Sequence, residues 1–170
     1  IGPRTALAVI SHASNVTGVV QPMYRLGAVC KENGIPLLVD AAQTAGVLDV
    51  RLDVLNADMV AMPGHKGLLG PQGVGLLALG PGMEPLPLIR GGTGSSSESL
   101  EQPDDLPDRY ESGTLPLPAI AGLLQGIRFA RKHQAEIHEY ESYLNTRLRQ
   151  GLSTLPGITC LGHPDAPRVG

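Results

Sequence analysis

Polar residues with catalytic potential stand at the ends of the apolar runs in this 170-residue sequence. The first run ends in 11-SHASNVTG-18, the second in 40-DAAQ-43, the third in 62-MPGHKG-67, and the fourth leads toward 91-GGTG-94. If these runs are neighbouring parallel strands, their carboxyl ends share one edge of the sheet, where ligands of open α/β sheets bind. The side chains expected to converge there are His12, Asn15, Asp40, Gln43, His65 and Lys66.

A lysine and an aspartate at one edge of a sheet suit one cofactor in particular. Pyridoxal phosphate is held as a Schiff base by a lysine amine, and a carboxylate facing its ring nitrogen keeps that nitrogen protonated, so that the ring can withdraw electrons. Its phosphate needs donors such as the N–H groups of glycine turns, hydroxyls or an imidazole. Lys66 and Asp40 therefore favour a pyridoxal phosphate site.

The elements that must position these residues alternate along the chain. Apolar, β-rich runs cover residues 5–11 and 35–39, and further strands are expected over 58–66 and 73–79. The segment between the first two runs reads as a helix, with Pro22 in its first turn and Gly34 after its end. This order predicts an α/β fold, a mainly parallel sheet with flanking helices.

The second half of the chain changes character. Residues 80–114 are rich in Gly, Pro and Ser and too long for a passive connection, so we expect a functional loop with a mobile centre. Helical periodicity returns over 117–134 and over 135–155, the latter with an apolar stripe from Ile137 to Leu155. A strand is expected over 158–162. We therefore predict a partial large domain over 1–133, followed over 134–170 by a long helix and the start of a small C-terminal α+β domain.

Composition excludes several classes of function. The net charge is −3, with four tyrosines, one phenylalanine and no tryptophan, which disfavours nucleic acid as a partner. No apolar run approaches the roughly 20 residues of a membrane span. Cys30 and Cys160 lack the spacing of a zinc site or a disulfide scaffold, so a reducing cytoplasm fits best. The chain opens almost directly on an expected strand and closes on 164-PDAPRVG-170, so we expect a piece of a longer polypeptide.

Four runs, in this order and spacing, resemble the class V aminotransferases, and most closely the cysteine desulfurase and selenocysteine lyase branch. They are TALAVISHASNVTGVVQP, LLVDAAQ, PGHKGLLGPQGVGLL and RYESGTLPLPAIAGL, and the resemblance covers roughly residues 3–125. It implies the large domain of a fold-type I pyridoxal phosphate enzyme, normally a homodimer with active sites at the subunit interface. It also implies a cysteine-like amino-acid substrate that reacts through an external aldimine, with a sulfur-acceptor protein as a possible partner.

The resemblance also implies roles for individual residues around the cofactor. Lys66 matches the Schiff-base lysine, which also moves the proton at the substrate α-carbon. Asp40 matches the partner of the pyridine nitrogen, and Gln43 the donor to the 3-hydroxyl oxygen of the ring. Ala42 matches a residue against the ring face.

Three further positions match residues at the phosphate and the substrate. His65 matches a phosphate-binding histidine, and Asn15 a residue that faces cofactor and substrate. Thr93 matches a residue that reaches the phosphate from the neighbouring subunit. Pro63 departs from the pattern, because many relatives have a serine there whose hydroxyl binds the phosphate.

Other family features fall outside the chain. The glycine-threonine phosphate loop and the residue that stacks on the ring belong before residue 1, and the catalytic cysteine and the substrate-carboxylate arginine belong after residue 170. Cys30 and Cys160 do not match the nucleophile position. A complete desulfurase cycle is therefore not expected from this segment alone, and transaminase, lyase or epimerase chemistry, or a non-catalytic dimerisation module, stay open.

Several of these residues also have purely structural interpretations. His12 could be a core histidine with a backbone partner, Asp40 a helix cap, and His65 a turn residue. Arg109 and Glu111 could pair with each other as a clamp or contact the substrate. Cys30 and Cys160 read as small buried hydrophobes. The glycines of 67-GLLGPQGVG-75 match neither phosphate-loop motif between a strand and a helix, which disfavours a nucleotide site.

Overall fold

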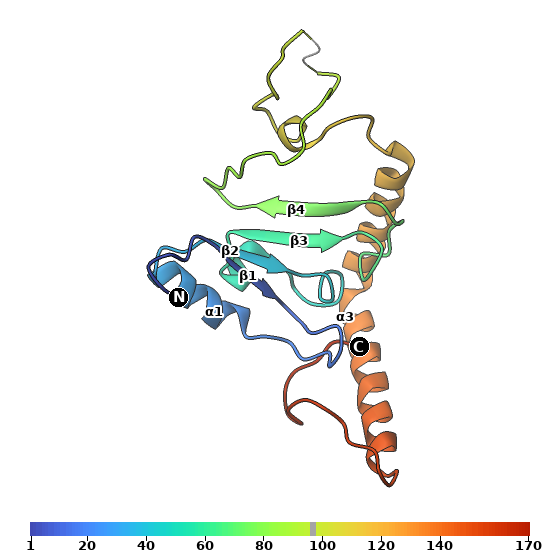
Figure 1. Ribbon diagram of the computed structural model, residues 1–170. Coiled ribbons are helices and arrows are strands. Elements are labelled where there is room, and N and C mark those ends of the chain that lie inside the picture. The colour runs from blue at the N-terminus through green and yellow to red at the C-terminus, as the bar shows by residue number, and fades with distance from the viewer. Residues whose placement is uncertain (96–97) are drawn as a thin grey trace.

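The computed structural model describes residues 1–95 and 98–170, so the expected mobile centre of the 80–114 loop lies partly outside the described residues. The elements follow the predicted order (Figure 1). They are β1 (Ala8–Ser11), α1 (Met23–Glu32), β2 (Leu37–Asp40), α2 (Leu52–Leu55), β3 (Met59–Pro63), β4 (Gly75–Leu79), a 3-10 turn (Asp108–Tyr110) and α3 (Leu117–Ser153).

The strands form one sheet in the order β1-β2-β3-β4, which confirms the mainly parallel α/β fold. β1, β2 and β3 run parallel, with Ser11 beside Asp40 and Asp40 beside Ala61. β4 is antiparallel to β3, because the glycine-rich turn between them is too short for a crossover connection. The carboxyl ends of β1, β2 and β3 therefore lie at one edge of the sheet, beside α3 (Figure 1).

One face of the sheet forms the core. Leu37, Val39 and Val60 alternate with less buried neighbours and are almost completely buried, as expected for period-two strands under helices. Met23 and Cys30 of α1 belong to the same cluster. Burial of a side chain of this size contributes about 1.5 to 3 kcal/mol, so this cluster fixes the strands that carry the site. Cys30 is thus a small buried hydrophobe, as predicted.

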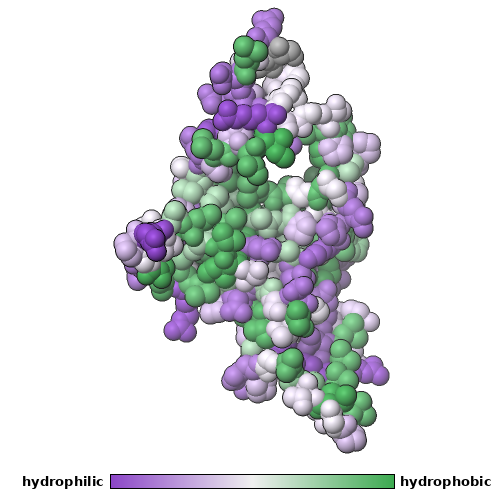
Figure 2. All heavy atoms as spheres, viewed as in Figure 1, coloured by the Kyte–Doolittle hydropathy of each residue, from purple (hydrophilic) through white to green (hydrophobic). Residues whose placement is uncertain are grey.

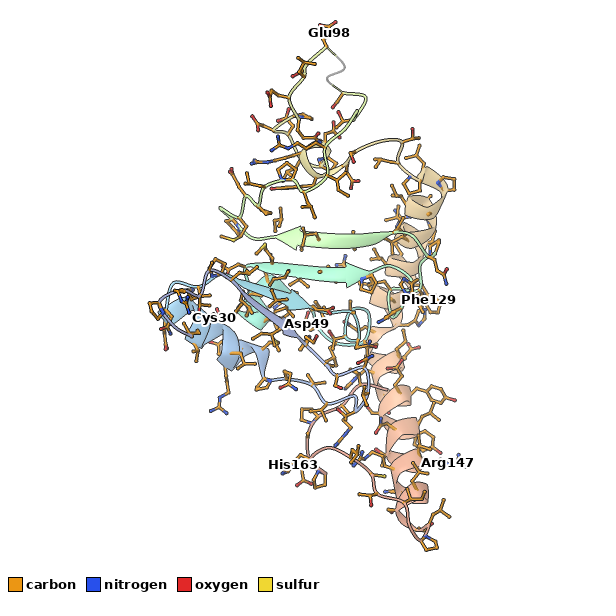
Figure 3. All side chains as sticks on the ribbon, in the orientation of Figure 1. Cys30, Asp49, Glu98, Phe129, Arg147 and His163 are labelled. Carbon is orange, nitrogen blue, oxygen red and sulfur yellow. The ribbon has the colours of Figure 1, made fainter. Side chains whose placement is uncertain are left out.

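The opposite face of the sheet is less covered. Val9 of β1 and Leu77 of β4 are 60% and 51% exposed, and hydrophobic residues gather over the sheet in the view of Figure 2. Figure 3 shows Cys30 on α1, whereas Phe129 and Arg147 lie along α3, which runs past the edge of the sheet where β1, β2 and β3 end.

The two helices expected over 117–134 and 135–155 are one helix of 37 residues, α3. The stretch 131-RKHQAEIHEYES-142 has no proline or glycine, so nothing in the sequence interrupts the helix there. Leu123, Gly126 and Ala130 are its buried residues, whereas the expected apolar stripe is exposed at Tyr140, Leu144 and Leu148. α3 runs through residue 133, and the proposed domain boundary at that position stays a prediction.

The strand expected over 158–162 is not formed, and the prediction was wrong. These five residues find no neighbouring strand to pair with among the described residues. The chain instead returns to the segment after β1, where Val20 N–H donates to the carbonyl of Pro167 (2.8 Å) and Val169 N–H donates to the carbonyl of Gly18 (3.0 Å). Cys160 is half-buried and lies in this irregular segment.

Of the two alternatives for Arg109 and Glu111, the mutual clamp is not formed among the described residues, and a contact with the substrate stays a prediction. Arg109 pairs with Glu84, 25 residues earlier, at 3.4 Å, and the hydroxyl of Tyr110 donates to the carbonyl of Pro85 (2.8 Å). The 3-10 turn at Asp108–Tyr110 places both side chains against the start of the loop.

Among the residues that the structure describes, no helix is long and apolar enough to cross a membrane.

Candidate functional site

A cavity of about 490 Å³ lies at the edge of the sheet where β1, β2 and β3 end. This volume falls within the range of small-molecule sites. Five of the seven residues predicted for the cofactor site line it, as expected from their positions at the strand ends. The complete lining is Ser11, Ala13, Ser14, Asn15, Asp40, Ala42, Gln43 and Lys66.

Asp40 is the last residue of β2 and is half-buried. The carboxylate oxygen Oδ1 accepts a hydrogen bond from the backbone N–H of Ala42 at 2.9 Å. Asp40 is therefore not a helix cap, because no helix begins directly after it. The bond closes a turn instead. The strand fixes the backbone of Asp40 and the bond fixes its side chain, so the carboxylate is held at the cavity.

The residues after Asp40 form a compact turn that carries Ala42 and Gln43. The N–H groups of Thr44 and Ala45 both donate to the carbonyl of Ala41, at 3.1 and 2.9 Å. This turn brings the Ala42 methyl group and the Gln43 amide to the cavity on which Asp40 lies.

Lys66 follows β3 in a second tight turn. The N–H of Leu69 donates to the carbonyl of Lys66 (2.8 Å) and that of Gly70 to the carbonyl of Gly64 (2.8 Å). Lys66 itself is exposed, and none of the ion pairs between described residues involves it. Lys66 therefore brings an amine to the wall of the cavity.

Asn15 stands on the loop after β1. The N–H of Gly18 donates to the carbonyl of Ser14 (2.9 Å), and the Ser14 hydroxyl accepts from the N–H groups of Val16 and Thr17 at 3.2 Å. These bonds close the loop so that Asn15 projects toward the cavity.

Two predicted residues stand apart from this cavity. His65 is exposed and is not among the lining residues. Thr93 lines a different cavity of about 270 Å³, formed within the loop between β4 and α3. The structure thus gathers Asn15, Asp40, Ala42, Gln43 and Lys66, and leaves His65 and Thr93 outside this group.

His12 is buried rather than at the cavity. Its Nδ1 lies 2.9 Å from Oγ1 of Thr44, a side chain with no exposed surface. Burial lowers the pKa of the His12 imidazole below its ordinary value of 6.5. The core interpretation of His12 is therefore correct, although its side-chain partner is a hydroxyl and not the backbone. No local pattern marks Thr44 as the partner of His12, whereas Ser11 and Ser14 belong to the polar run at the end of β1.

A second cavity of about 490 Å³ lies at the other end of the sheet, near the amino ends of β2 and β3. Lys31, Asp53 and Asp58 are its charged residues, but Asp58 already accepts the backbone N–H of Leu37 at 2.7 Å. None of the residues predicted for chemistry lies there, so the strand-end cavity is the better candidate.

The residue types of the strand-end cavity fit pyridoxal phosphate. Lys66 supplies an amine and Asp40 a carboxylate that is fixed at the end of a strand. Asn15 and Gln43 supply two amides, and the small side chain of Ala42 leaves room for a flat ring. The hydroxyls of Ser11 and Ser14 are additional polar groups on its wall.

Comparison with known proteins agrees with this geometry. A probable cysteine desulfurase of Methanothermobacter thermautotrophicus is 34% identical over 169 residues, covering 96% of this chain and 42% of that protein. The apo structure of cysteine desulfurase from Thermococcus onnurineus superposes with a TM-score of 0.72 at 30% identity, covering 87% of this chain and 38% of that one. The structure of SspA in complex with cysteine gives a TM-score of 0.63 at 36% identity, covering 75% and 34%.

The chain spans about two fifths of the length of the first of these relatives. The family model "Aminotransferase class-V" matches residues 1–170, which is the whole of this chain. With the parallel sheet and the lysine-aspartate cavity at its edge, this match shows that the chain belongs to the class V aminotransferase family, whose members are pyridoxal phosphate enzymes.

Proposed function

We propose that the protein containing this chain is a cysteine desulfurase-like enzyme, in which Lys66 binds pyridoxal phosphate covalently and Asp40 faces the ring nitrogen. The observation that carries this proposal is the single cavity that joins the Lys66 amine, the Asp40 carboxylate and the Gln43 amide. When bound, the cofactor would supply an electron sink for the α-carbon of an amino acid.

The residues of the chain would then have distinct tasks. Asp40 would hold a proton on the ring nitrogen, and Gln43 would donate to the 3-hydroxyl oxygen of the ring. Ala42 would pack on the ring, and Asn15 would orient the substrate. The Lys66 amine would remove and return the proton at the α-carbon of the substrate. His65 and, from a second subunit, Thr93 bind the phosphate in this proposal.

The substrate would be an amino acid such as cysteine. Support comes from the relatives named cysteine desulfurases and from the similar SspA structure that contains cysteine. Transfer of sulfur from cysteine leaves alanine and converts an enzyme thiol to a persulfide. Cys30 is a buried residue of α1 and neither it nor Cys160 lines the cavity, so we place this thiol outside the present chain. A sulfur-acceptor protein in the cytoplasm would take the persulfide sulfur.

The decisive experiment follows the cofactor on Lys66. Pyridoxal phosphate is added to the complete protein, the absorbance of the lysine-bound cofactor is recorded, and borohydride reduction followed by peptide mass spectrometry locates the bound group. We expect the cofactor mass on the Lys66 peptide, and its absence in Lys66→Ala. Lys132→Ala is a matched control, because Lys132 is an exposed lysine of α3 away from the cavity. Labelling of Lys132 in place of Lys66 would refute the proposal.

Substrate and assembly need separate tests. We expect alanine and sulfide from cysteine in the presence of a thiol reductant; formation of pyruvate or a keto acid would instead favour the lyase or transaminase alternative. For the proposed homodimer, a mixed dimer of Lys66→Ala and Thr93→Ala subunits should regain one intact site. Equal loss in mixed and unmixed dimers would place Thr93 in its own subunit's site, and native activity of the Thr93→Ala dimer would place it outside any site.

A further inference from the structure

His12 and Thr44 form a polar contact on the side of the site that faces away from the cavity. Nδ1 of His12 and Oγ1 of Thr44 are 2.9 Å apart, and the two residues are 5% and 0% exposed. Their chain neighbours Ser11, Ala13 and Gln43 line the cavity, whereas His12 and Thr44 do not. The pair therefore connects the wall formed by the end of β1 with the wall formed by the turn after β2, on the side away from the cavity.

The main chain joins the same two walls. The N–H of His12 donates to the carbonyl of Asp40 at 2.8 Å and extends the pairing of β1 with β2 by one residue. The carbonyl of His12 accepts from the N–H of Gln21 at 2.8 Å. His12 thus holds the start of the Asp40–Gln43 segment through its backbone and its end through its side chain.

Thr44 is the central residue of that turn. Its N–H donates to the carbonyl of Ala41 (3.1 Å), and its own carbonyl accepts from Val47 (3.0 Å) and Leu48 (2.8 Å). Its hydroxyl lies 3.5 Å from the Ala41 carbonyl and 2.9 Å from the imidazole. A small shift of Thr44 would therefore move Gln43 at once.

A buried hydrogen bond of this kind adds little net stability, since two apolar groups of the same shape can replace it at nearly no loss. What it does supply is direction, because a hydrogen bond prefers a short and nearly linear arrangement of its atoms. Burial keeps the imidazole neutral, so the pair places no second charge behind Asp40.

We propose that His12 is a positioning residue, which holds the Asp40–Gln43 segment on the cavity opposite Lys66 through its contacts with Thr44 and Asp40. This inference rests on the proposed function for its effect on the cofactor, but its effect on the turn does not depend on any ligand.

The test compares shape-matched variants in the complete protein. Thr44→Val keeps the volume and removes the hydroxyl, whereas Thr44→Ser keeps the hydroxyl. His12→Leu removes the ring nitrogen, whereas His12→Asn keeps a polar atom near the place of Nδ1. Three quantities are measured: the dissociation constant of pyridoxal phosphate, the amide hydrogen exchange of the 41–45 turn, and the free energy of unfolding.

We expect Thr44→Val and His12→Leu to weaken cofactor binding about fivefold to tenfold, the equivalent of one lost hydrogen bond. Exchange in the 41–45 turn should rise by a similar factor while exchange in β3 stays the same, and the Ser and Asn variants should restore both quantities. The proposal is overturned if Thr44→Val matches the native protein in binding and exchange. If the native protein binds no cofactor through Lys66, the proposed function fails, and the exchange data alone decide whether the pair holds the turn.

Discussion

Gly46 and Gly67 meet backbone to backbone where the turn after β2 touches the turn that carries Lys66. A Cβ atom on Gly46 would overlap the carbonyl oxygen of Gly67, and one on Gly67 would overlap that of Ala45. Gly46 also has φ +88°, which L side chains rarely adopt. This contact sets the distance between the two walls of the candidate site, so the glycine after Lys66 serves close packing of the two turns.

Gly67→Ala should therefore destabilise the protein and disturb the site. The added methyl group meets backbone atoms that cannot rotate away, so we expect a loss of about 1 to 3 kcal/mol in the free energy of unfolding, measured by urea denaturation. The control is Gly151→Ala in the last turns of α3, where an added Cβ has open space. That change should leave stability equal or raise it by up to about 1 kcal/mol. Equal effects of the two variants would contradict a close contact at Gly67.

Much of the site could be predicted from sequence because strand ends are marked by abrupt changes in polarity. The run 35-IPLLV-39 is apolar on both faces and stops at Asp40, so both the buried strand and the placement of its last residue followed from the residue types. The pairing of His12 with Thr44 could not be predicted in this way. The two residues are 32 positions apart, and their contact depends on the register of β1 and β2 and on the shape of the following turn.

The errors have similar physical causes. Arg109 and Glu111 are two residues apart, but the 3-10 turn directs Arg109 to Glu84, which no local pattern indicates. Helical periodicity over 117–134 and over 135–155 predicts two helices, but no proline or glycine separates them at residue 134, so α3 continues through that position. A contact between distant residues decided the first case, and the uninterrupted run of helix-compatible residues decided the second.

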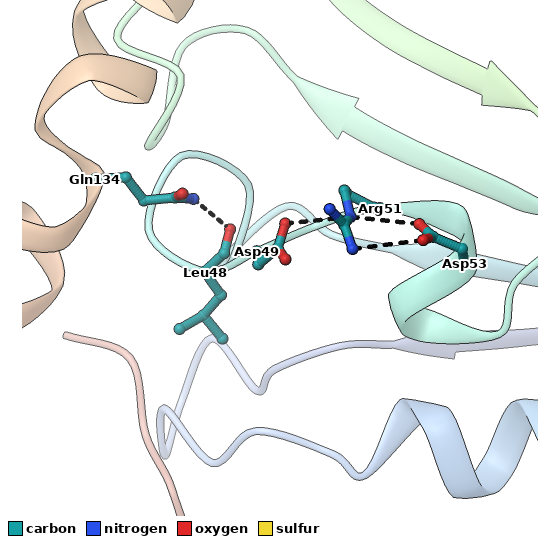
Figure 4. Close-up of polar contacts among 5 residues, drawn as sticks. All are labelled: Leu48, Asp49, Arg51, Asp53 and Gln134. Carbon is teal, nitrogen blue, oxygen red and sulfur yellow. Dashed lines mark hydrogen bonds and ion pairs between the residues drawn. The ribbon is translucent and has the colours of Figure 1, made fainter.

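Gln134 ties α3 to the turn after β2, and its replacement should weaken that contact. Its Nε2 donates to the carbonyl of Leu48 at 2.6 Å (Figure 4). Gln134→Leu keeps a side chain of similar bulk but leaves the carbonyl of the half-buried Leu48 without this donor. We expect a loss of about 1 kcal/mol in the free energy of unfolding.

The same figure contains a matched contrast. Arg51 pairs with Asp49 and Asp53 at 3.7 and 3.3 Å, but these side chains are 59% to 76% exposed (Figure 4). Arg51→Ala should change the free energy of unfolding by less than about 0.5 kcal/mol, because exposed ion pairs contribute little. A larger loss of unfolding free energy for Arg51→Ala than for Gln134→Leu would contradict the conclusion that the Gln134 hydrogen bond stabilises the fold more than the exposed ion pairs of Arg51 do.

His12 should make stability depend on pH. Its pKa is lowered by burial in the folded state, so between that value and about 6.5 the unfolded chain binds more protons at this group than the folded protein does. The stabilising contribution of neutral His12 is therefore complete above about pH 6.5 and is lost as the pH falls below it. Urea denaturation across this range should give a positive slope of unfolding free energy with pH. In His12→Asn this part of the slope should vanish, and an unchanged slope would assign the effect to other groups.

Gln102 should control the shape of the segment that carries Thr93. Its Nε2 donates to the carbonyls of Asp108 (2.9 Å) and Glu111 (3.1 Å), while its Oε1 accepts the N–H of Gly91 (3.3 Å). Gln102→Glu keeps the size of the side chain but sets a carboxylate oxygen against two carbonyl oxygens. This repulsion should release the segment, and we expect cleavage between residues 84 and 113 to become at least about fivefold faster in limited proteolysis, since local opening governs such cleavage. Gln125→Glu, an exposed position on α3, introduces the same charge and should leave the cleavage rate as in the native protein. If both variants are cleaved alike, added charge explains the change and the three hydrogen bonds of Gln102 do not hold the loop. If only Gln102→Glu is cleaved faster, the segment that presents Thr93 is shaped within its own subunit, before any second subunit contacts it.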